Sequence, residues 1–566
     1  MAPPYFFVSL WASRRLPRPI LFLLLLLLSS PVFGQTHQPT LHPQAPAGSQ
    51  TCASCHADIY RTYMKTAMAQ ASGPAADGLI AGEFKHARTG IHYKVYSQDG
   101  RVWLSFDRNK PALHGKRELL YYVGSGRRGR TYLFSDDGFL FESPVNWYAQ
   151  KHLWDMTPAY QNAQQMPMLP ALPPCLNCHT SGMAAPLPGT ENRYPMPPFA
   201  HGGISCQRCH GSGEEHIRSQ GKAAIINPVK LAPERRDDIC MQCHLEGNVA
   251  VERAGKHPYD FRPGDRLSDY VRYFEVVSPQ LPGLGALSQV EALAQSVCKK
   301  KTGDAMSCMS CHDPHSWPAQ EEKVAYYRGK CLACHGEAFG KKHQHGNPNC
   351  IGCHMPPVQS RDVAHTQATD HRILRRPGSQ PVLSDLQGSS RPAEPQLASF
   401  PASAGPPDLR DLALAWDALV RRGYQQFRQK ARQLLTQALQ QNPNDATVAT
   451  DLGYLEQKAG KTDEARQLYQ QALKNDPTRL DAAVDLGVME AQSGNLSSAL
   501  KLWQDAFNRA PGRSAIGIDL AMVSCDLGQV AAARSYLQRV LQFNPDMGMA
   551  RDLLAHLDAQ PPRCRP

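Results

Sequence analysis

Cysteines three residues apart, each pair followed at once by a histidine, recur along this 566-residue chain. The two thiols of a C-x-x-C-H run can add to the vinyl groups of a haem while the next imidazole reaches the iron from one face. The pattern therefore predicts covalently attached haem c. Seven copies, numbered here as motifs 1 to 7 in chain order, use 14 of the 17 cysteines: Cys52/Cys55/His56, Cys175/Cys178/His179, Cys206/Cys209/His210, Cys240/Cys243/His244, Cys308/Cys311/His312, Cys331/Cys334/His335 and Cys350/Cys353/His354.

Zinc sites and disulfide bonds are the alternative uses of paired cysteines. Zinc takes C-x-x-C units as ligands but requires no histidine directly after the second cysteine. Histidine makes up 22 of the 566 residues. Seven such placements by chance then have a probability of roughly 10⁻¹⁰, which excludes both alternatives as the origin of the spacing. We expect seven covalently attached haems c, each held by two cysteines and the histidine of its motif.

Each iron needs a second axial ligand or keeps an open position. The best-placed imidazoles outside the motifs are those of His216, His315, His365 and His371, together with His343 or His345, of which we select His345. Histidine is more often a surface residue than a ligand, but a chain with many irons reverses that expectation. For six others the sequence leaves ligation and a structural role equally open: His86, His92, His114, His152, His201 and His257.

The first motif differs from the others because no histidine follows His56 closely. The next 16 residues, "ADIYRTYMKTAMAQAS", read as helical and carry Met64 and Met68. A thioether ligand stabilises ferrous iron and raises the potential of its haem, so Met68 is a candidate second ligand there. Core packing of Met68, with ligation by a histidine of the following hairpin, is the alternative.

The first 34 residues have the layout of an export signal. A basic stretch precedes an apolar run from Ile20 to Leu28, and small or helix-breaking residues surround Gly34. The run is about half of the ~20 residues that a membrane span needs, so we expect cleavage near Gly34 rather than anchoring. No cysteine precedes Cys52, which leaves no lipid attachment site at the cleavage point. We expect a periplasmic or otherwise extracytoplasmic protein without a transmembrane helix in the mature chain.

The formal net charge of +11 describes the precursor without haem. Removal of residues 1–34 takes away three arginines and no acidic residue, which leaves +8. Each haem adds about −1 when ferric and about −2 when ferrous, so seven haems give roughly +1 oxidised and roughly −6 reduced. The basic excess therefore requires no nucleic-acid partner.

Residues 50–376 hold all seven motifs, with short irregular connections except for 123 residues between Cys52 and Cys175. Alternation of polar and apolar residues around Asp99-Gly100 and Asp137-Gly138 predicts two hairpins there, in a small β-rich insertion at about 84–148. With about 46 residues for each haem, the region is too short for a separate side-chain core around each group. The haems themselves are expected to form much of its interior, close enough for electrons to hop between them.

A second region follows residues 377–408, a Pro-, Ser- and Gly-rich segment that reads as a flexible linker. A 34-residue period then spaces Pro443, Pro477, Pro511 and Pro545, as well as Gly460, Gly494 and Gly528. This period is typical of the tetratricopeptide repeat, in which glycine lies in the turn and proline follows the second helix. We expect repeats over 409–560, few contacts with the haem region, and Cys525 as a thiol in a helix core. The repeat groove is expected to bind a protein or peptide; a scaffold or oligomerisation arm is the alternative.

The predicted fold is therefore mainly α: a multihaem cytochrome domain with a small β insertion, followed by an α-solenoid of tetratricopeptide repeats. The runs "ISCQRCHGSGEEH", "SCMSCHDPH" and "TCASCHADIYRTYMKTAMAQA" resemble the multihaem cytochromes related to the tetrahaem cytochrome partner of hydroxylamine oxidoreductase and to that enzyme. The resemblance implies that His216 and His315 are distal ligands. It places Met68 where the relatives often carry a histidine. This chain has seven motifs, whereas the tetrahaem cytochrome has four and the enzyme has eight. It also has no match to the enzyme's substrate-site tyrosine cross-link. The resemblance therefore does not imply hydroxylamine oxidation.

Two classes of function remain. The favoured one is an electron carrier that relays electrons through seven haems and docks a redox partner protein through its repeats. The alternative is an oxidoreductase with one open haem site for a small nitrogen or sulfur oxyanion or a hydroxylamine-like substrate. Arg127, Arg128 and Arg130 could guide such an anion, although a solvated loop or haem-propionate partners are the more frequent roles of such a cluster.

Overall fold

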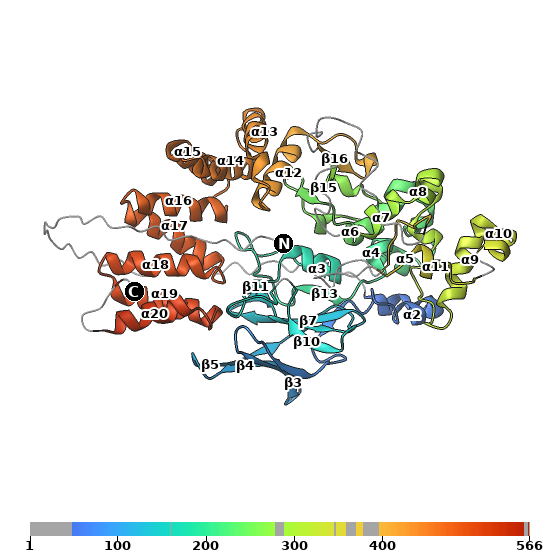
Figure 1. Ribbon diagram of the computed structural model, residues 1–566, viewed down its shortest axis with the longest axis horizontal. Coiled ribbons are helices and arrows are strands. Elements are labelled where there is room, and N and C mark those ends of the chain that lie inside the picture. The colour runs from blue at the N-terminus through green and yellow to red at the C-terminus, as the bar shows by residue number, and fades with distance from the viewer. Residues whose placement is uncertain are drawn as a thin grey trace. The chain divides into compact units, whose positions relative to one another are not determined.

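The computed structural model describes residues 48–158, 160–277, 288–343, 347–357, 369–376, 396–559 and 564. The predicted export signal, His345, His365 and residues 377–395 of the predicted linker lie outside these ranges. The described residues all belong to one compact unit. Figure 1 shows their helices and strands in chain order. Within them, none of the helices combines the length and the hydrophobicity of a membrane span.

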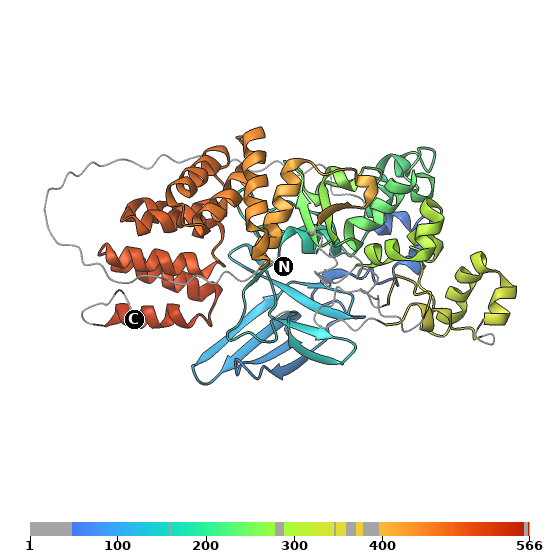
Figure 2. The same cartoon turned by 45° about the horizontal axis from the view of Figure 1, so that its top comes forward.

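Both predicted hairpins are present, inside two antiparallel sheets. The first sheet has the order β2 (Gly82–Lys85), β3 (His92–Gln98), β4 (Arg101–Arg108) and β5 (Leu113–Leu119), which are the long blue strands of Figure 2. Its β3–β4 turn is Asp99-Gly100, where both residues have positive φ. The second sheet has the order β1 (Ser72–Pro74), β6 (Tyr121–Val123), β7 (Gly129–Asp136), β8 (Phe139–Glu142) and β11 (Leu169–Pro170), with β9 (Val145–Tyr148) on β7 and β10 (Leu153–Met156) on β9.

The strands therefore extend from 72 to 170, well beyond the predicted 84–148. The prediction of a mainly α fold holds for the repeats but not for this part of the haem region. Strands of two or three residues, such as β1 and β11, are too short to show alternation, which is why the pattern did not indicate them.

The remainder of the haem region consists of short helices and hairpins that carry the motifs. The helices that do not end in a motif histidine are α1 (Ser49–Cys52), α2 (Ala57–Tyr63), α5 (Glu214–Arg218), α7 (Gln289–Gln295), α8 (Val297–Thr302) and α10 (Glu337–Lys342). The hairpin β12 (Thr180–Met183) with β13 (Phe199–Gly202) separates motifs 2 and 3.

A third sheet joins the two regions. Strands β14 (Val249–Glu252) and β15 (Val271–Val277) come from the haem region, and β16 (Gln396–Phe400) comes from the segment predicted as linker. The register of β16 on β15 runs from Tyr273 opposite Phe400 to Val277 opposite Gln396. Residues 396–400 are thus part of the fold and differ from the predicted flexible linker, because backbone pairing with β15 orders a segment whose composition alone reads as a loop.

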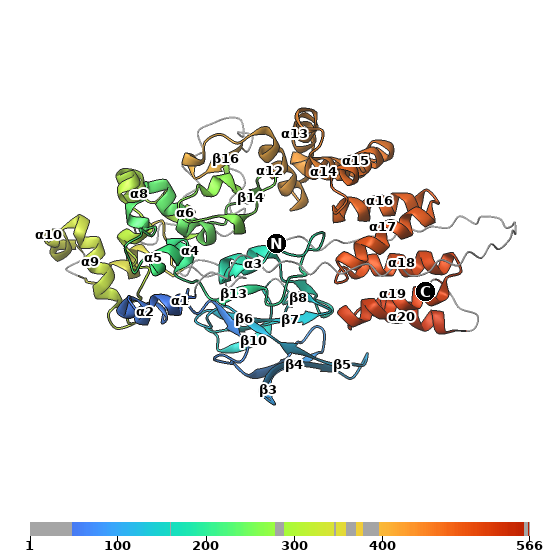
Figure 3. The same ribbon diagram turned by 180° about the vertical axis from the view of Figure 1, so that it is seen from behind.

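The repeat region is an α-solenoid of stacked antiparallel helix pairs, which Figures 1 and 3 show in chain order. Close packing between the two helices of a repeat depends on small residues: a Cβ on Gly487 would lie 2.3 Å from Trp503 Nε1. The helices are α12 (Leu409–Arg421), α13 (Arg428–Gln441), α14 (Ala446–Lys458), α15 (Thr462–Asn475), α16 (Leu480–Gln492), α17 (Leu496–Arg509), α18 (Ser514–Asp526), α19 (Val530–Phe543) and α20 (Gly548–Asp558).

Cys525 is not a free thiol in the helix core. It forms a disulfide with Cys564, 39 residues later, which ties the C-terminal tail to α18. The 34-residue period does not reach Cys564, so the repeat pattern could not indicate this pairing.

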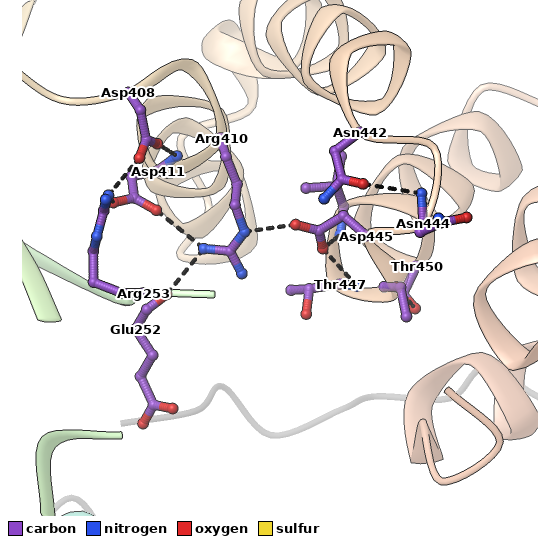
Figure 4. Close-up of polar contacts among 12 residues, drawn as sticks. Glu252, Arg253, Asp408, Arg410, Asp411, Asn442, Asn444, Asp445, Thr447 and Thr450 are labelled. Carbon is purple, nitrogen blue, oxygen red and sulfur yellow. Dashed lines mark hydrogen bonds and ion pairs between the residues drawn. The ribbon is translucent and has the colours of Figure 1, made fainter. Parts of the chain in front are cut away.

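The first repeat is attached to the haem region by an apolar cluster and an ionic network. Trp416 and Leu419 of α12 share the cluster with Val249, Val251 and Phe274 of the third sheet. Figure 4 shows the ionic network beside it, in which the Arg253 guanidinium at the end of β14 pairs with Asp411 of α12.

Arg410 extends that network from the strand to the second repeat. Its Nη1 donates to the carbonyl of Glu252 at 3.0 Å, and its Nε lies 2.6 Å from Asp445 Oδ2 at the start of α14. The network fixes the first repeat against β14 and the second repeat against the first.

The last repeats are attached to the β sheets at a second place. Phe543 is fully buried with Phe139 and Phe141, at ring-centroid distances of 6.0 and 5.8 Å. Asp546 pairs with Arg108 of β4 at 2.5 Å, with both side chains nearly buried. The prediction of few contacts between the two regions is therefore wrong. Composition identified a linker, but it carries no information about which surfaces become buried against each other.

Candidate haem centres

Each motif lies on a single helical turn. In a helix, cysteines at positions i and i+3 and a histidine at i+4 share one face, so such a turn presents both thiols and the imidazole to the same side. His56 directly precedes α2, and His312 follows the 3₁₀ turn Cys308–Ser310. The other five motif histidines end a helix: His179 in α3 (Pro173–His179), His210 in α4 (Gln207–His210), His244 in α6 (Pro233–His244), His335 in α9 (Lys323–His335) and His354 in α11 (Cys350–His354).

Thiols of different motifs meet one another. Neighbouring thiols interact in the pairs Cys52 and Cys206, Cys178 and Cys243, Cys240 and Cys308, and Cys331 and Cys350. Longer-range electrostatic interactions relate Cys209 to Cys243 and Cys311 to Cys334. These six interactions relate all seven motifs, with motifs 1, 3, 4, 5, 6 and 7 following one another and motif 2 beside motif 4.

The second thiol of motif 1 lies in a turn between two helices. Cys55 is exposed, and it lies in the turn between α1 and α2, because α1 already ends at Cys52. Its Sγ accepts a hydrogen bond from the adjacent Ser54 Oγ at 3.9 Å, whereas Cys52 meets a thiol of motif 3. The His56 N–H still donates to Cys52 O at 2.9 Å, so the turn keeps the motif's spacing. Haem attachment through Cys55 remains a prediction.

Exposure is shared by three other motif cysteines, which are Cys175, Cys334 and Cys353. A thioether forms at the edge of the porphyrin, where the vinyl groups are, so a cysteine at the surface can still hold a haem. The expectation that the haems form much of the interior stays a prediction.

Four motif histidines face a second imidazole. The distances between ring centroids are 6.4 Å for His56 and His216, 5.9 Å for His210 and His315, 6.3 Å for His312 and His371, and 5.7 Å for His354 and His343. Two metal–nitrogen bonds of about 2 Å, plus roughly 1 Å from each nitrogen to its ring centre, place trans imidazoles about 6 Å apart. The four pairs therefore have the spacing of axial ligands on one iron.

Hydrogen bonds at Nδ1 prepare several of these rings for ligation. The Nδ1–H of His210 donates to Ile226 O at 2.8 Å, and that of His216 donates to Ala223 O at 2.8 Å. Because a carbonyl oxygen only accepts, Nδ1 must carry the proton, which leaves the Nε2 lone pair free for a metal.

The later pairs show the same arrangement. The Nδ1–H of His371 donates to Thr369 O at 2.9 Å, and that of His354 donates to a backbone carbonyl at 2.5 Å. Burial, together with His371 and His244, lowers the pKa of His312 to about 4, so its imidazole is neutral at pH 7 and able to ligate. The thiols, the helical turns and the paired imidazoles of motifs 1, 3, 5 and 7 fit a haem c with two histidine ligands.

The structure thus brings three predicted ligands, His216, His315 and His371, opposite motif histidines. For motif 7 it places His343 there, whereas the predicted His345 and also His365 lie outside the described residues. Among the described residues, no imidazole faces His244 or His335 in the same way. No group of three or more His, Cys, Asp or Glu side chains within the described ranges is arranged to hold a free metal ion.

Met68 is half-buried beyond α2, where its carbonyl accepts a hydrogen bond from the Ile204 N–H at 2.9 Å. The ring opposite His56 is that of His216, from the segment after motif 3. The paired imidazoles favour His216 over Met68 as the second ligand of the first motif, and Met68 remains a prediction from the sequence. Sequence spacing pointed to His216 as a ligand, but it could not tell which motif His216 would face.

The hairpin histidines have structural partners. His86 is buried, and its two ring nitrogens bond to Thr89 Oγ1 and Gln161 O, both at 3.0 Å. His92 lies between Glu83 and Asp107 on the surface of the first sheet. Neither ring has a nitrogen free for iron.

The arginine cluster also has a structural role. Arg130 is buried over the Tyr122 ring, and its guanidinium donates to four backbone carbonyls, including Gly78 O at 2.6 Å. Arg127 donates to Lys65 O at 2.6 Å. These contacts of Arg127 and Arg130 tie the loop to its neighbours.

Comparisons with known proteins agree with this division of the chain. The family model of cytochrome c554 and c-prime matches residues 145–211, which include motifs 2 and 3. The tetratricopeptide-repeat model matches residues 428–488 and 490–557. The C-terminal region is a tetratricopeptide-repeat array, and residues 145–211 are similar to cytochrome c554 and c-prime. A search of curated proteins finds no match.

Several solved structures match about a quarter of this chain. MamA from Desulfovibrio magneticus RS-1 is 17% identical with a TM-score of 0.25, over 27% of this chain and 86% of that one. MamA AMB-1 is 22% identical with a TM-score of 0.24, over 26% and 77%. YrrB, described as a repeat protein with an unusual peptide-binding site, is 22% identical with a TM-score of 0.21, over 22% and 63%. Likenesses of this size say nothing about function.

The choice between His216 and Met68 can be tested directly. Replacing His216 by alanine is expected to convert one low-spin haem to a high-spin, carbon monoxide-binding haem, because the ring opposite His56 is removed. Met68→Ala is the matched control and should leave the spectrum unchanged. Loss of a near-infrared sulfur-to-iron band and a fall of the highest midpoint potential in Met68→Ala would instead assign the ligand to Met68.

Proposed function

We propose that this protein is an exported cytochrome with seven covalently bound haems c, which relays electrons and docks a redox partner through its repeat array. The observation that carries the proposal is the single network of contacts between the seven motifs, together with the four pairs of facing imidazoles. Haems with two histidine ligands transfer electrons without binding substrate. Two histidine ligands at motifs 1, 3, 5 and 7 favour electron transfer at these four haems over the alternative of an open, catalytic site.

The protein's own residues would hold and insulate the haems. The thiols tether each group, and the Nδ1 hydrogen bonds of His210, His216, His354 and His371 fix the rings that face the iron. The Cys525–Cys564 disulfide supports an oxidising compartment, in line with the predicted export signal. The repeat array supports protein or peptide docking because its helix pairs form an extended surface.

The number and coordination of the haems test this function. The purified protein should contain seven haems by the pyridine haemochrome assay, with an intact mass that shows seven additions. Carbon monoxide should bind less than one haem per chain in the reduced protein. A haem count well below seven would contradict the proposal, and one stoichiometric carbon monoxide site would favour the oxidoreductase.

A further inference from the structure

The segment that carries motifs 6 and 7 contains a continuous row of rings. His335 ends α9, Phe339 lies in α10, and His343 follows α10 directly. The centroid distance is 5.2 Å between His335 and Phe339 and 4.9 Å between Phe339 and His343, with interplanar angles of 30° and 16°. His343 then faces His354 at 5.7 Å and 31°. The row therefore joins the histidine of motif 6 to that of motif 7 through one phenylalanine and one further imidazole.

We propose that His343 is the second axial ligand of the motif 7 haem and that Phe339 positions His335 and His343. This inference rests on the proposed function, since it requires haem c at both motifs. It assigns His343 in place of the predicted His345, two residues further on.

The distance between the His343 and His354 rings is the main evidence that His343 is the second ligand at motif 7. It matches the roughly 6 Å between two imidazoles on opposite sides of one iron, as in the other three pairs. The Nδ1–H of His354 is bonded to Leu374 O, so its Nε2 is the nitrogen that remains for the metal. Helices α9 and α11, which carry motifs 6 and 7, pack against each other, with the thiols of Cys331 and Cys350 as neighbours. Both faces of the motif 7 iron are thereby supplied from residues 343–354.

The surroundings of Phe339 support its proposed role in positioning His335 and His343. Its side chain is 48% exposed, so it is not a core residue, and stacking on two imidazoles accounts for its orientation. The helix that presents it is held close to α9: a Cβ on Gly340 would lie only 2.7 Å from Leu332 Cδ2 and 3.2 Å from the Arg328 guanidinium. α10 is short and ends at Lys342, directly before His343, so the Phe339 ring is the aromatic surface against which the His343 ring packs.

The ligand assignment is tested with full-length, exported protein by counting haems and carbon monoxide sites in the same sample. His343→Ala should keep the wild-type haem count and gain one carbon monoxide-binding haem, which added imidazole should abolish. His345→Ala is the matched control and should gain none. A gain in His345→Ala but not in His343→Ala, or a gain in neither, would overturn the assignment. Should His343→Ala fail to mature, His343→Met should mature and raise one midpoint potential, because a thioether replaces an imidazole; unchanged potentials would overturn the assignment.

The role of Phe339 has a separate readout. Phe339→Ala should keep all haems but give a carbon monoxide-binding fraction between zero and one per chain and shift the midpoint potential of that haem. Phe339→Tyr, which keeps the aromatic face, should restore the wild-type values. Wild-type spectra and potentials in Phe339→Ala would overturn the positioning role. A haem count below seven in the unmutated protein would instead sink the proposed function, so the two failures are distinguishable.

Discussion

Replacing Cys206 and Cys209 together by alanine is expected to cost more than the one haem of motif 3. Cys206 interacts with Cys52 of motif 1, and Cys209 interacts with Cys243 of motif 4. His210 faces His315, which follows motif 5. Loss of the tether and of the apolar porphyrin surface should therefore disturb three neighbouring motifs at once. We expect five haems or fewer per chain and a fall of roughly 10 °C in the unfolding temperature, corresponding to several kcal/mol.

Motif 7 supplies the control for this experiment. The thiol contact of Cys350 is with motif 6 alone among the contacts described above, so motif 7 is at one end of the network. Cys350→Ala with Cys353→Ala should remove one haem and lower the unfolding temperature by less. The measurements are haem counting, intact mass and thermal unfolding followed by circular dichroism. Six haems and an unchanged melting profile in the motif 3 variant would contradict the role of motif 3 as a hub.

The sequence predicts the parts of this protein that repeat. The C-x-x-C-H motifs are local, so their spacing alone indicates two thiols and an imidazole on one turn. The repeat helices are equally visible, because each buries its apolar face against a neighbour in a fixed 34-residue period. In both cases the information lies within a few tens of residues.

What the sequence could not show depends on pairing between distant segments. β16 is ordered by β15, more than a hundred residues earlier in the chain, although its composition reads as linker. His343 and His345 are two residues apart, and only the fold decides which one faces His354. One signal was available: Phe543 occupies a repeat position held by Arg509 and Asn475 in the preceding repeats. An apolar exception at a polar position indicates a surface that becomes buried elsewhere.

Phe543, the apolar residue at this repeat position, is also where we expect the second large effect of a substitution. Phe543→Ala is expected to destabilise the protein by about 3–5 kcal/mol, the usual cost of removing a fully buried phenylalanine. Asp546→Ala should cost a similar amount, about 3–5 kcal/mol, because it leaves the Arg108 guanidinium without its carboxylate in a nearly buried site. Asp546 also accepts a hydrogen bond from the Met166 N–H at 2.9 Å, which this change would leave unsatisfied. Both variants are measured by denaturant unfolding.

An exposed ion pair at the same contact provides the comparison. Arg539 lies 2.9 Å from Asp137, with side chains 32% and 48% exposed, so Arg539→Ala should cost at most about 1 kcal/mol. Cleavage of the chain near Pro392 tests whether these contacts or a flexible linker alone connects the haem region to the repeats. The coloured haem part and the repeats should co-elute from a sizing column after cleavage of the unmutated chain, because Phe543, Asp546 and the α12 cluster hold them together. They should part more readily in the Phe543→Ala and Asp546→Ala variants. Two separate peaks from the cleaved unmutated chain would show that these contacts do not hold the regions together and would restore the flexible-linker arrangement that composition suggested.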